Sequence, residues 1–225
     1  MARVFDGSDS NYLSITNPLG GLDISGTPMT VSAWVFPTTL PTNGRIAGKD
    51  SQTAVTPRGW NLHTSAGNLF RFEILDASGG GYNLTTAAST GVWAHVCGVH
   101  NSGVRNSLYK NGAEAAFNTN SRTLADTAFD FTIGRNPSVA TSAFNGRIAE
   151  VAIWASALTA TQVAALARGA NPLMFNKSTL RAYYPLYSGA AANEPDLSGG
   201  QQLLTEVGTV AGGNHAPVMP LMEVV

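Results

Sequence analysis

The sequence predicts an all-β protein that folds as a two-sheet antiparallel sandwich, and two observations support this. Short runs of alternating polar and apolar residues, separated by Gly, Asn, Pro and Ser, fill residues 1–155. A period of two is typical of strands that bury one face. The chain has 225 residues, and single β-sandwich domains often run to roughly 200–250 residues. We therefore expect one sandwich, with one short helix near 160–168 and an extended C-terminal tail.

Eight segments up to residue 154 show the strand pattern. They are Tyr12–Ile15, Met29–Phe36, Trp60–His63, Leu69–Leu75, Trp93–His100, Asn106–Lys110, Phe129–Ile133 and Gly146–Trp154. The clearest is Leu69–Leu75, where Phe70, Phe72 and Ile74 alternate with two charged residues. Such alternation predicts a strand with one face in the core and the other in water.

Local signals predict the remaining elements. Asn111-Gly112 predicts a hairpin, since this pair suits a type I′ turn. Thr159 and Gln162 form a capping box, so a helix should begin just after Thr159. Gly169 is the expected helix end. A last strand is expected at Leu180–Leu186.

Composition and charge exclude several classes of partner. Only 12% of residues are charged and the net charge is −1, against about 25% charged residues in an ordinary soluble domain. The chain therefore lacks the basic footprint of a nucleic-acid binder or a polybasic membrane patch. It also has no apolar run near 20 residues and no signal-peptide pattern. We expect no nucleic-acid or membrane partner, synthesis in a cytoplasm, and some surface covered by other proteins.

Several sequence pieces occur together in a fixed order. They are Val4–Gly7 with Tyr12–Ile15, Thr30–Val35, Gly91–Val96, Leu108–Gly112, Phe131–Gly134, Phe144–Trp154 and Leu158–Leu166. This order resembles the laminin G-like, concanavalin A-like lectin/glucanase jelly-roll domains. The resemblance implies a jelly roll over residues 1–187 and a C-terminal extension, 188–225, that packs on the domain or on a neighbouring subunit. The later segment, from residue 182, resembles tails of this domain in tailed-bacteriophage structural proteins.

The acidic residues argue against an enzyme. Glycanases of the resembled fold carry carboxylates at alternate positions of one strand, and a retaining mechanism needs two carboxyls about 5–5.5 Å apart. Here Glu73 and Glu150 are each alone in their strands, and no Gly-x-Ser-x-Gly elbow is present. Cys97, the only cysteine, lies in an apolar run and is expected to be a small buried residue. We therefore expect no catalytic residues.

One metal site is conceivable at the edge of the sandwich. In the resembled fold the first and last core strands are neighbours, and they carry Asp6 and Glu150. These two acids are the candidate ligands for a Ca²⁺ ion, and no other cofactor is expected. The alternative is that Asp6 caps its turn and Glu150 pairs with an arginine such as Arg147 or Arg45.

Aromatic and polar residues assigned to loops are the candidate glycan contacts. They are Arg58, Trp60, Tyr82, Asn83, Arg135 and Asn136. Aromatic rings can stack on sugar rings, and loop residues commonly carry binding functions. The alternative is that Trp60 and Tyr82 fill the sandwich interior.

The end of the chain is apolar and contains two prolines. Its candidate partner-binding residues are Pro217, Val218, Met219, Pro220, Leu221 and Met222. Because proline disfavours both helix and central strand, this segment is expected to lie along another subunit. The sequence therefore predicts a non-catalytic structural protein of a bacteriophage virion, either a capsid decoration or a tail-associated subunit. Its expected partners are other virion proteins, further copies of itself and host-surface glycans. The alternative function is a carbohydrate-binding, lectin-like adhesion module.

Overall fold

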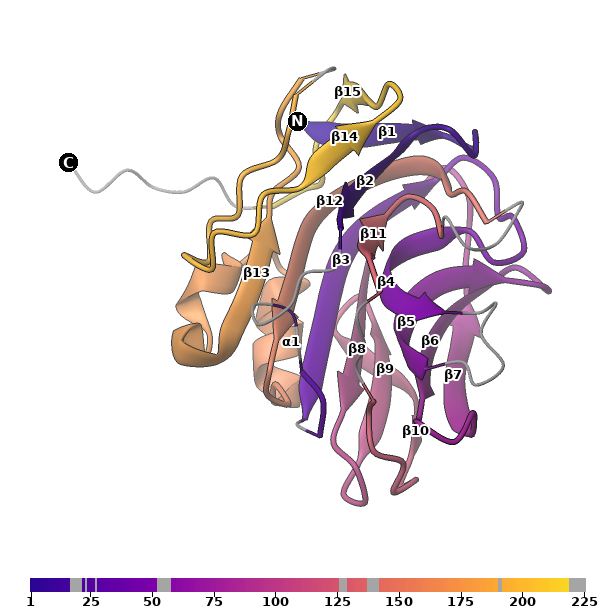
Figure 1. Cartoon of the computed structure of the whole chain (residues 1–225), viewed down its shortest axis with the longest axis vertical. Coiled ribbons are helices and arrows are strands. Elements are labelled where there is room, and N and C mark those ends of the chain that lie inside the picture. The colour runs from indigo at the N-terminus through magenta and orange to yellow at the C-terminus, as the bar shows by residue number, and fades with distance from the viewer. Residues whose placement is uncertain are drawn as a thin grey trace.

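The chain folds into two antiparallel sheets, and the apolar residues of the alternating pattern lie between them, as the sequence predicts (Figure 1). The structure is a computed structural model that describes residues 1–16, 22, 24–26, 28–51, 58–125, 129–136, 142–189 and 192–218, with backbone only at 51 and 58. In these residues every paired strand runs antiparallel to its neighbour. No described helix has the length and hydropathy of a membrane-spanning helix.

Sheet A has eight strands in the described part of the chain. Seven of them follow the order β10 (Ala113–Asn118), β9 (Asn106–Lys110), β8 (Ala94–His100), β3 (Met29–Pro37), β12 (Asn145–Trp154), β1 (Ala2–Asp6) and β15 (Ala211–Gly213). The eighth, β13 (Leu180–Tyr184), pairs with the end of β12 that β1 leaves free.

Sheet B has seven described strands. Their order is β14 (Thr205–Val207), β2 (Tyr12–Ile15), β11 (Phe131–Ile133), β4 (Arg45–Ser51), β5 (Arg58–Ser65), β6 (Leu69–Leu75) and β7 (Gly81–Ala87). The strands β4 to β7 follow one another in the chain and in the sheet, so they form a simple meander.

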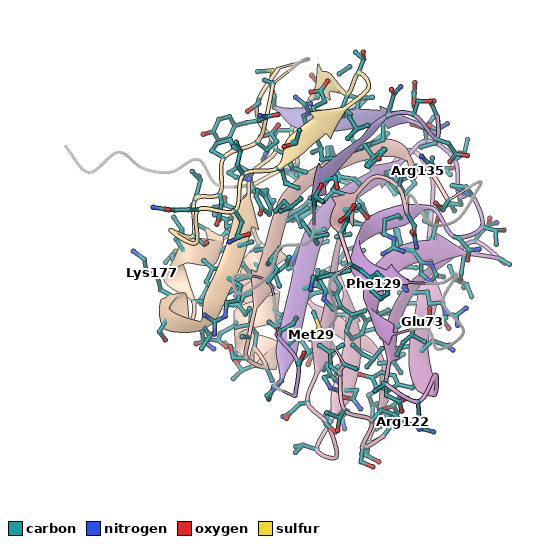
Figure 2. The ribbon with its side chains drawn as sticks, viewed as in Figure 1. Met29, Glu73, Arg122, Phe129, Arg135 and Lys177 are labelled. Carbon is teal, nitrogen blue, oxygen red and sulfur yellow. The ribbon has the colours of Figure 1, made fainter. Side chains whose placement is uncertain are left out.

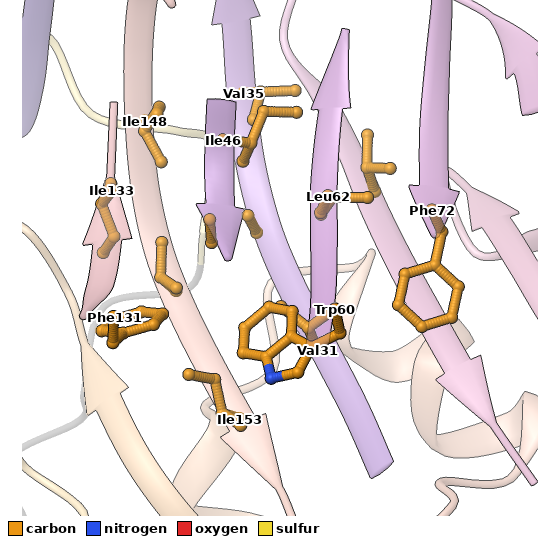
Figure 3. Close-up of a cluster of buried hydrophobic side chains, with 14 of the residues drawn as sticks. Val31, Val35, Ile46, Trp60, Leu62, Phe72, Phe131, Ile133, Ile148 and Ile153 are labelled. Carbon is orange, nitrogen blue, oxygen red and sulfur yellow. The ribbon is translucent and has the colours of Figure 1, made fainter. Parts of the chain in front are cut away.

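The core lies between the two sheets (Figure 3). Val31, Val35, Ile148 and Ile153 come from sheet A, and they face Ile46, Trp60, Leu62, Phe72, Phe131 and Ile133 of sheet B. All of these side chains are at most 1% exposed. Burial of one large apolar side chain stabilises a fold by about 1.5–3 kcal/mol, so this layer dominates the stability of the sandwich.

A short helix covers part of the outer face of sheet A. Helix α1 (Ala160–Leu166) begins at the Thr159 capping box and packs Val163 and Leu166 against Trp154. Two 3₁₀ turns, η1 (Pro172–Met174) and η2 (Lys177–Thr179), connect it to β13. Cys97 is buried beneath this cover, as expected.

The C-terminal extension joins both sheets. Its strand β14 pairs with β2 and its strand β15 pairs with β1. Leu204 and Val210 enter the main core, and the buried carboxylate of Glu194 lies 3.5 Å from Nε of Arg3. Residues 192–218 therefore pack on the domain from which they extend.

Candidate functional site

The outer face of sheet B carries charged and amide side chains where strands β4, β5 and β6 lie side by side. We call this group the polar cluster, and it consists of Arg45, Asp50, Asn61, His63, Arg71 and Glu73. Trp60 and Leu62 of β5 face the core. Asn61 and His63 alternate with them and therefore face outward.

The strand register places the polar cluster in two rows. Asn61 lies opposite Glu73, which lies opposite Asn83 on β7. In the next row, His63 lies opposite Arg45 on one side and Arg71 on the other. Side chains directly opposite each other on one face are about 4.5–5.5 Å apart at Cβ, so each row holds a continuous line of polar groups.

Asn61 links two carboxylates, that of Glu73 in its own row and that of Asp50 on the neighbouring strand β4. Its Nδ2 donates to Asp50 Oδ2 at 3.1 Å and to Glu73 Oε2 at 3.2 Å. Arg45 pairs with Asp50, and Arg71 donates to Glu73 at 2.8 Å. Each carboxylate therefore has an arginine on one side and the same amide on the other, so the pairs fix one another's geometry.

Most of the polar cluster is buried. Arg45, Asp50, Asn61 and His63 are at most 5% exposed, whereas the side chains of Arg71 and Glu73 are 29% and 15% exposed. Burial, followed by the charges of Arg45 and Arg71, lowers the pKa of His63 to about 3, so its imidazole is neutral near pH 7. Nε2 of His63 and Oδ1 of Asn61 are buried and have no hydrogen-bond partner among the described residues.

A glycine in β4 makes room for this arrangement. A Cβ atom at Gly48 would overlap the guanidinium of Arg45 and come within 2.9 Å of the Asn61 Cβ atom. Glycine inside a strand often marks such a close approach. Arg45 can therefore lie flat on the sheet and reach Asp50 on the same strand.

The two carboxylates also bear on the question of an enzyme. Because both accept from one nitrogen, their oxygens lie within about 6 Å of each other, near the spacing of a retaining glycosidase. A general acid, however, needs surroundings that keep it protonated, such as an apolar pocket. Each carboxylate here has an arginine partner instead. Arg71 and Glu73, the partly exposed members of the polar cluster, therefore offer a fixed donor and a fixed acceptor, which suit hydroxyl groups of a ligand.

The predicted aromatic glycan contacts lie inside the protein. Trp60 is 1% exposed and packs on Phe131 with ring centroids 6.0 Å apart. Tyr82 is 7% exposed, and its hydroxyl is 2.9 Å from Nδ1 of His100. Neither ring forms an exposed platform, because both occupy inward positions of their strands. Both rings lie in the core between the sheets, as in the alternative interpretation of the sequence.

The predicted polar glycan contacts are scattered. Asn83 is exposed and lies directly opposite Glu73 of the polar cluster on the neighbouring strand. Glu73 is labelled in Figure 2. Arg135, also labelled, lies 3.4 Å from Asp9 and over the ring of Tyr12, so it holds the turn after β1. Asn136 is 3% exposed. The side chain of Arg58 lies outside the described residues.

The two candidate calcium ligands are too far apart to share an ion. Asp6 pairs with Asn145 in the strand register, whereas Arg3 pairs with Ile148. Glu150 is thus about five positions further along β12, or roughly 16 Å at strand rise. Asp6 instead accepts from the backbone N–H of Ser8, as a turn cap does. Among the residues that the structure describes, no group of three or more His, Cys, Asp or Glu could hold a metal ion.

The start of the predicted partner-binding tail packs on its own domain. Val218 contacts the small cluster formed by Ala2, Trp34, Ala149 and Ala216 on the outer face of sheet A, while Pro217 is exposed. The rest of the predicted tail, Met219, Pro220, Leu221 and Met222, lies outside the described residues.

A broad polar hollow lies beside the turn that follows β6. It encloses about 760 Å³ between the turn after β6 and the segment 119–125. Arg122, labelled in Figure 2, donates to Asp76 at 2.8 Å inside it. Hydroxyl groups of Ser78, Ser121 and Thr123 contribute to its lining. It offers further hydrogen-bonding groups, but no described aromatic ring lines it.

The fold is a two-sheet sandwich, and the outer face of its sheet B carries a polar cluster that is mostly buried. The model of the concanavalin A-like lectin/glucanases superfamily (Laminin_G_3) matches residues 6–164. The chain therefore belongs to this superfamily. No curated protein matches the chain significantly in sequence.

Solved structures show the same fold. A putative carbohydrate-binding protein from Bacteroides ovatus is 21% identical with a TM-score of 0.72, and the match covers 97% of this chain but only 61% of that protein. Domain 4 of AbnA, an extracellular arabinanase of Geobacillus stearothermophilus solved with arabinotriose, is 25% identical with a TM-score of 0.59, and the match covers 74% and 76% of the two chains. The CBM40 of a Ruminococcus gnavus sialidase, bound to sialyllactose, is 14% identical with a TM-score of 0.60, covering 74% and 97%.

Proposed function

We propose that this protein is a non-catalytic carbohydrate-binding module that holds an oligosaccharide on the outer face of sheet B. The observation that carries the proposal is the pair of arginine-bound carboxylates joined by Asn61. Paired acceptors and donors with fixed geometry can bind neighbouring hydroxyl groups without first being ordered, which lowers the entropic cost of binding. Arg71, Glu73 and Asn83 are the accessible members of this surface.

The charges of the polar cluster favour a neutral sugar. Its two arginines and two carboxylates cancel, and His63 is neutral near pH 7. An acidic sugar would have to compete with Glu73 for Arg71. Arabinotriose, the ligand of the similar arabinanase domain, is a neutral oligosaccharide, which supports the same class of ligand here.

Titration calorimetry with arabinotriose and with sialyllactose tests this proposal. We expect the neutral oligosaccharide to bind more tightly, and Glu73→Gln to weaken it about tenfold or more, since loss of a charged hydrogen bond costs about 1.5–3 kcal/mol. The matched control is Glu114→Gln, which removes another arginine-paired carboxylate, on β10 of sheet A. Equal weakening by both variants, or binding of neither sugar, would contradict the site.

The absence of catalysis is tested separately. We expect no release of reducing sugar from arabinan or from arabino-oligosaccharides by the intact protein. Hydrolysis that Glu73→Gln or Asp50→Asn abolishes would show that the two carboxylates act as a catalytic pair.

The lectin-like alternative is the better supported of the two functions predicted from the sequence. The similar structures include carbohydrate-binding domains, and nothing in the comparisons links the chain to bacteriophage proteins. Location in a virion, contacts with virion proteins and assembly into a homo-oligomer stay predictions. Mass spectrometry of purified particles and the solution mass of the protein test them.

A further inference from the structure

A second pocket lies on the opposite side of the molecule, on the outer face of sheet A. It encloses about 380 Å³ where β12, β13 and the C-terminal segment meet. Apolar atoms of Met1, Leu197, Ala216 and Val218 contribute to its walls. Its volume falls in the range of small-molecule sites, about 300–1,000 Å³. Among its described lining residues, Glu150 is the one carboxylate.

An irregularity in β12 directs Glu150 to this pocket. The register of β12 shifts between Ala149 and Ala152, and Glu150 has a φ of 54°. Val151 still faces the core, while Ala149 lies in the outer cluster, so the bulge gives Glu150 a place on the outer face. A left-handed backbone costs a non-glycine residue roughly 1 kcal/mol or more, and bulges often redirect a side chain at a binding site.

Two neighbours hold the carboxylate of Glu150. The hydroxyl of Tyr183 donates to Oε2 at 2.5 Å, and Nε2 of His215 lies 3.0 Å from Oε1. The Glu150 side chain is only 11% exposed. Burial raises the pKa of Tyr183, so its hydroxyl stays neutral. His215 is thus the partner that can supply a positive charge.

The other titratable groups near Glu150 do not replace His215. Tyr187 lines the same pocket and carries no cationic group. His95 adjoins Glu150 in a separate small cavity, and burial lowers its pKa to about 3. The amino group of Met1 opposes the charge of His215. When His215 is neutral, none of the described residues places another positive side chain beside the mostly buried carboxylate of Glu150, which is costly unless a cation binds.

We propose that this pocket binds an organic ammonium ion with an apolar body. The ammonium group donates to Glu150 in place of the protonated imidazole of His215, and the apolar body fills the space beside Leu197 and Val218. The ring of Tyr187 adds a cation–π contact. The site is independent of the sugar-binding face, since it lies on the other sheet.

Competition with His215 gives the site a pH dependence. The hydrogen bond that His215 donates to Glu150, the largest cause, raises the pKa of His215 above 6.5. Below that pKa the imidazolium compensates Glu150, and a second cation gains little. As the pH rises through it, the carboxylate loses its partner. Affinity for the ammonium ion therefore increases with pH.

Calorimetry on the full chain with benzylammonium, and with benzyl alcohol as the neutral isostere, tests the proposal. We expect benzylammonium to bind at least tenfold more tightly at about pH 8.5 than at about pH 5.5, and benzyl alcohol to bind at neither. Glu150→Gln should abolish binding. His215→Gln should retain binding and lose its pH dependence. A lysine-containing tripeptide, measured beside benzylammonium, distinguishes a peptide ammonium group from a free amine.

Controls keep the result interpretable. Tyr187→Ala, at an exposed wall position, should weaken binding several-fold and leave the melting temperature near that of the parent, which covers the case that Glu150→Gln fails to fold. Glu73→Gln should leave amine binding unchanged, so failure of the sugar site and of this site are distinguishable. Equal binding of benzyl alcohol and benzylammonium, or full affinity in a folded Glu150→Gln variant, would overturn the proposal.

Discussion

Asn61 holds the polar cluster together, so replacing it with leucine should measure what the cluster contributes. Leucine has the same branching and number of side-chain heavy atoms as asparagine, with bulkier methyl groups and no hydrogen-bonding group. The substitution removes the nitrogen that donates to Asp50 at 3.1 Å and to Glu73 at 3.2 Å. Asn61 is fully buried, and water does not readily replace the lost donor.

The expected cost follows from these contacts. A hydrogen bond to a charged group contributes about 1.5–3 kcal/mol, and two are lost. Part of the loss is offset, because the unpartnered Oδ1 of Asn61 no longer has to be buried, which returns about 1–3 kcal/mol. We therefore expect Asn61→Leu to lower the free energy of unfolding by about 2–4 kcal/mol. For a chain of this length the melting temperature should fall by about 4–16 °C.

Urea unfolding at pH 7, followed by fluorescence and circular dichroism, measures this change. The matched control is Asn83→Leu, an exposed position in the same cross-strand row, where a change within about 0.5 kcal/mol is expected. Sugar binding should fall in Asn61→Leu even though Asn61 itself is buried, since Glu73 loses its fixed position. If Asn61→Leu were as stable as the parent, the amide would not organise the two carboxylates.

Three further predictions concern the sandwich itself. Gly98→Ala should lower the free energy of unfolding, measured in urea, by about 1–3 kcal/mol, because the new Cβ atom would overlap the buried ring of Phe72. Burial lowers the folded-state pKa values of His63 and His95 to about 3. The unfolded chain therefore binds more protons below about pH 6.5, and the free energy of unfolding falls from there toward pH 3. His63→Gln should reduce this loss between about pH 7 and pH 4, and an unchanged pH profile would contradict the expectation. Thr159→Ala should cost about 1 kcal/mol of unfolding free energy through loss of the helix cap, and a gain in stability would refute that role.

The predictable strands are those whose sequence shows which face is buried. Leu69–Leu75 and Asn106–Lys110 have the predicted bounds. The strand Ala113–Asn118 was predicted only through its hairpin turn, because it is an edge strand with mostly exposed residues. The last strand ends at Tyr184 rather than Leu186, since Leu186 has a φ of 61° and leaves the extended conformation.

The candidate sugar site could not be predicted from spacing along the chain. Asp50, Asn61 and Glu73 are separated by eleven and twelve residues and meet only because β4, β5 and β6 are neighbours in register. A search for two acids on one strand therefore misses them. The position of Trp60, in contrast, was open to prediction, because it shares the alternation of Leu62 and so belongs to the core face.

Because the chain carries few charged residues, their concentration in the polar cluster calls for an explanation. Only 12% of residues are charged, yet four of them, Arg45, Asp50, Arg71 and Glu73, meet on one face of sheet B, and two of these are buried. Apolar residues of similar volume can often replace a buried ion pair without loss of stability. Stability alone therefore gives little reason to place these charges here. A face that must present fixed hydrogen-bonding groups to a ligand does give a reason, and this is why the polar cluster rather than the predicted loop aromatics is the surface to test for sugar binding.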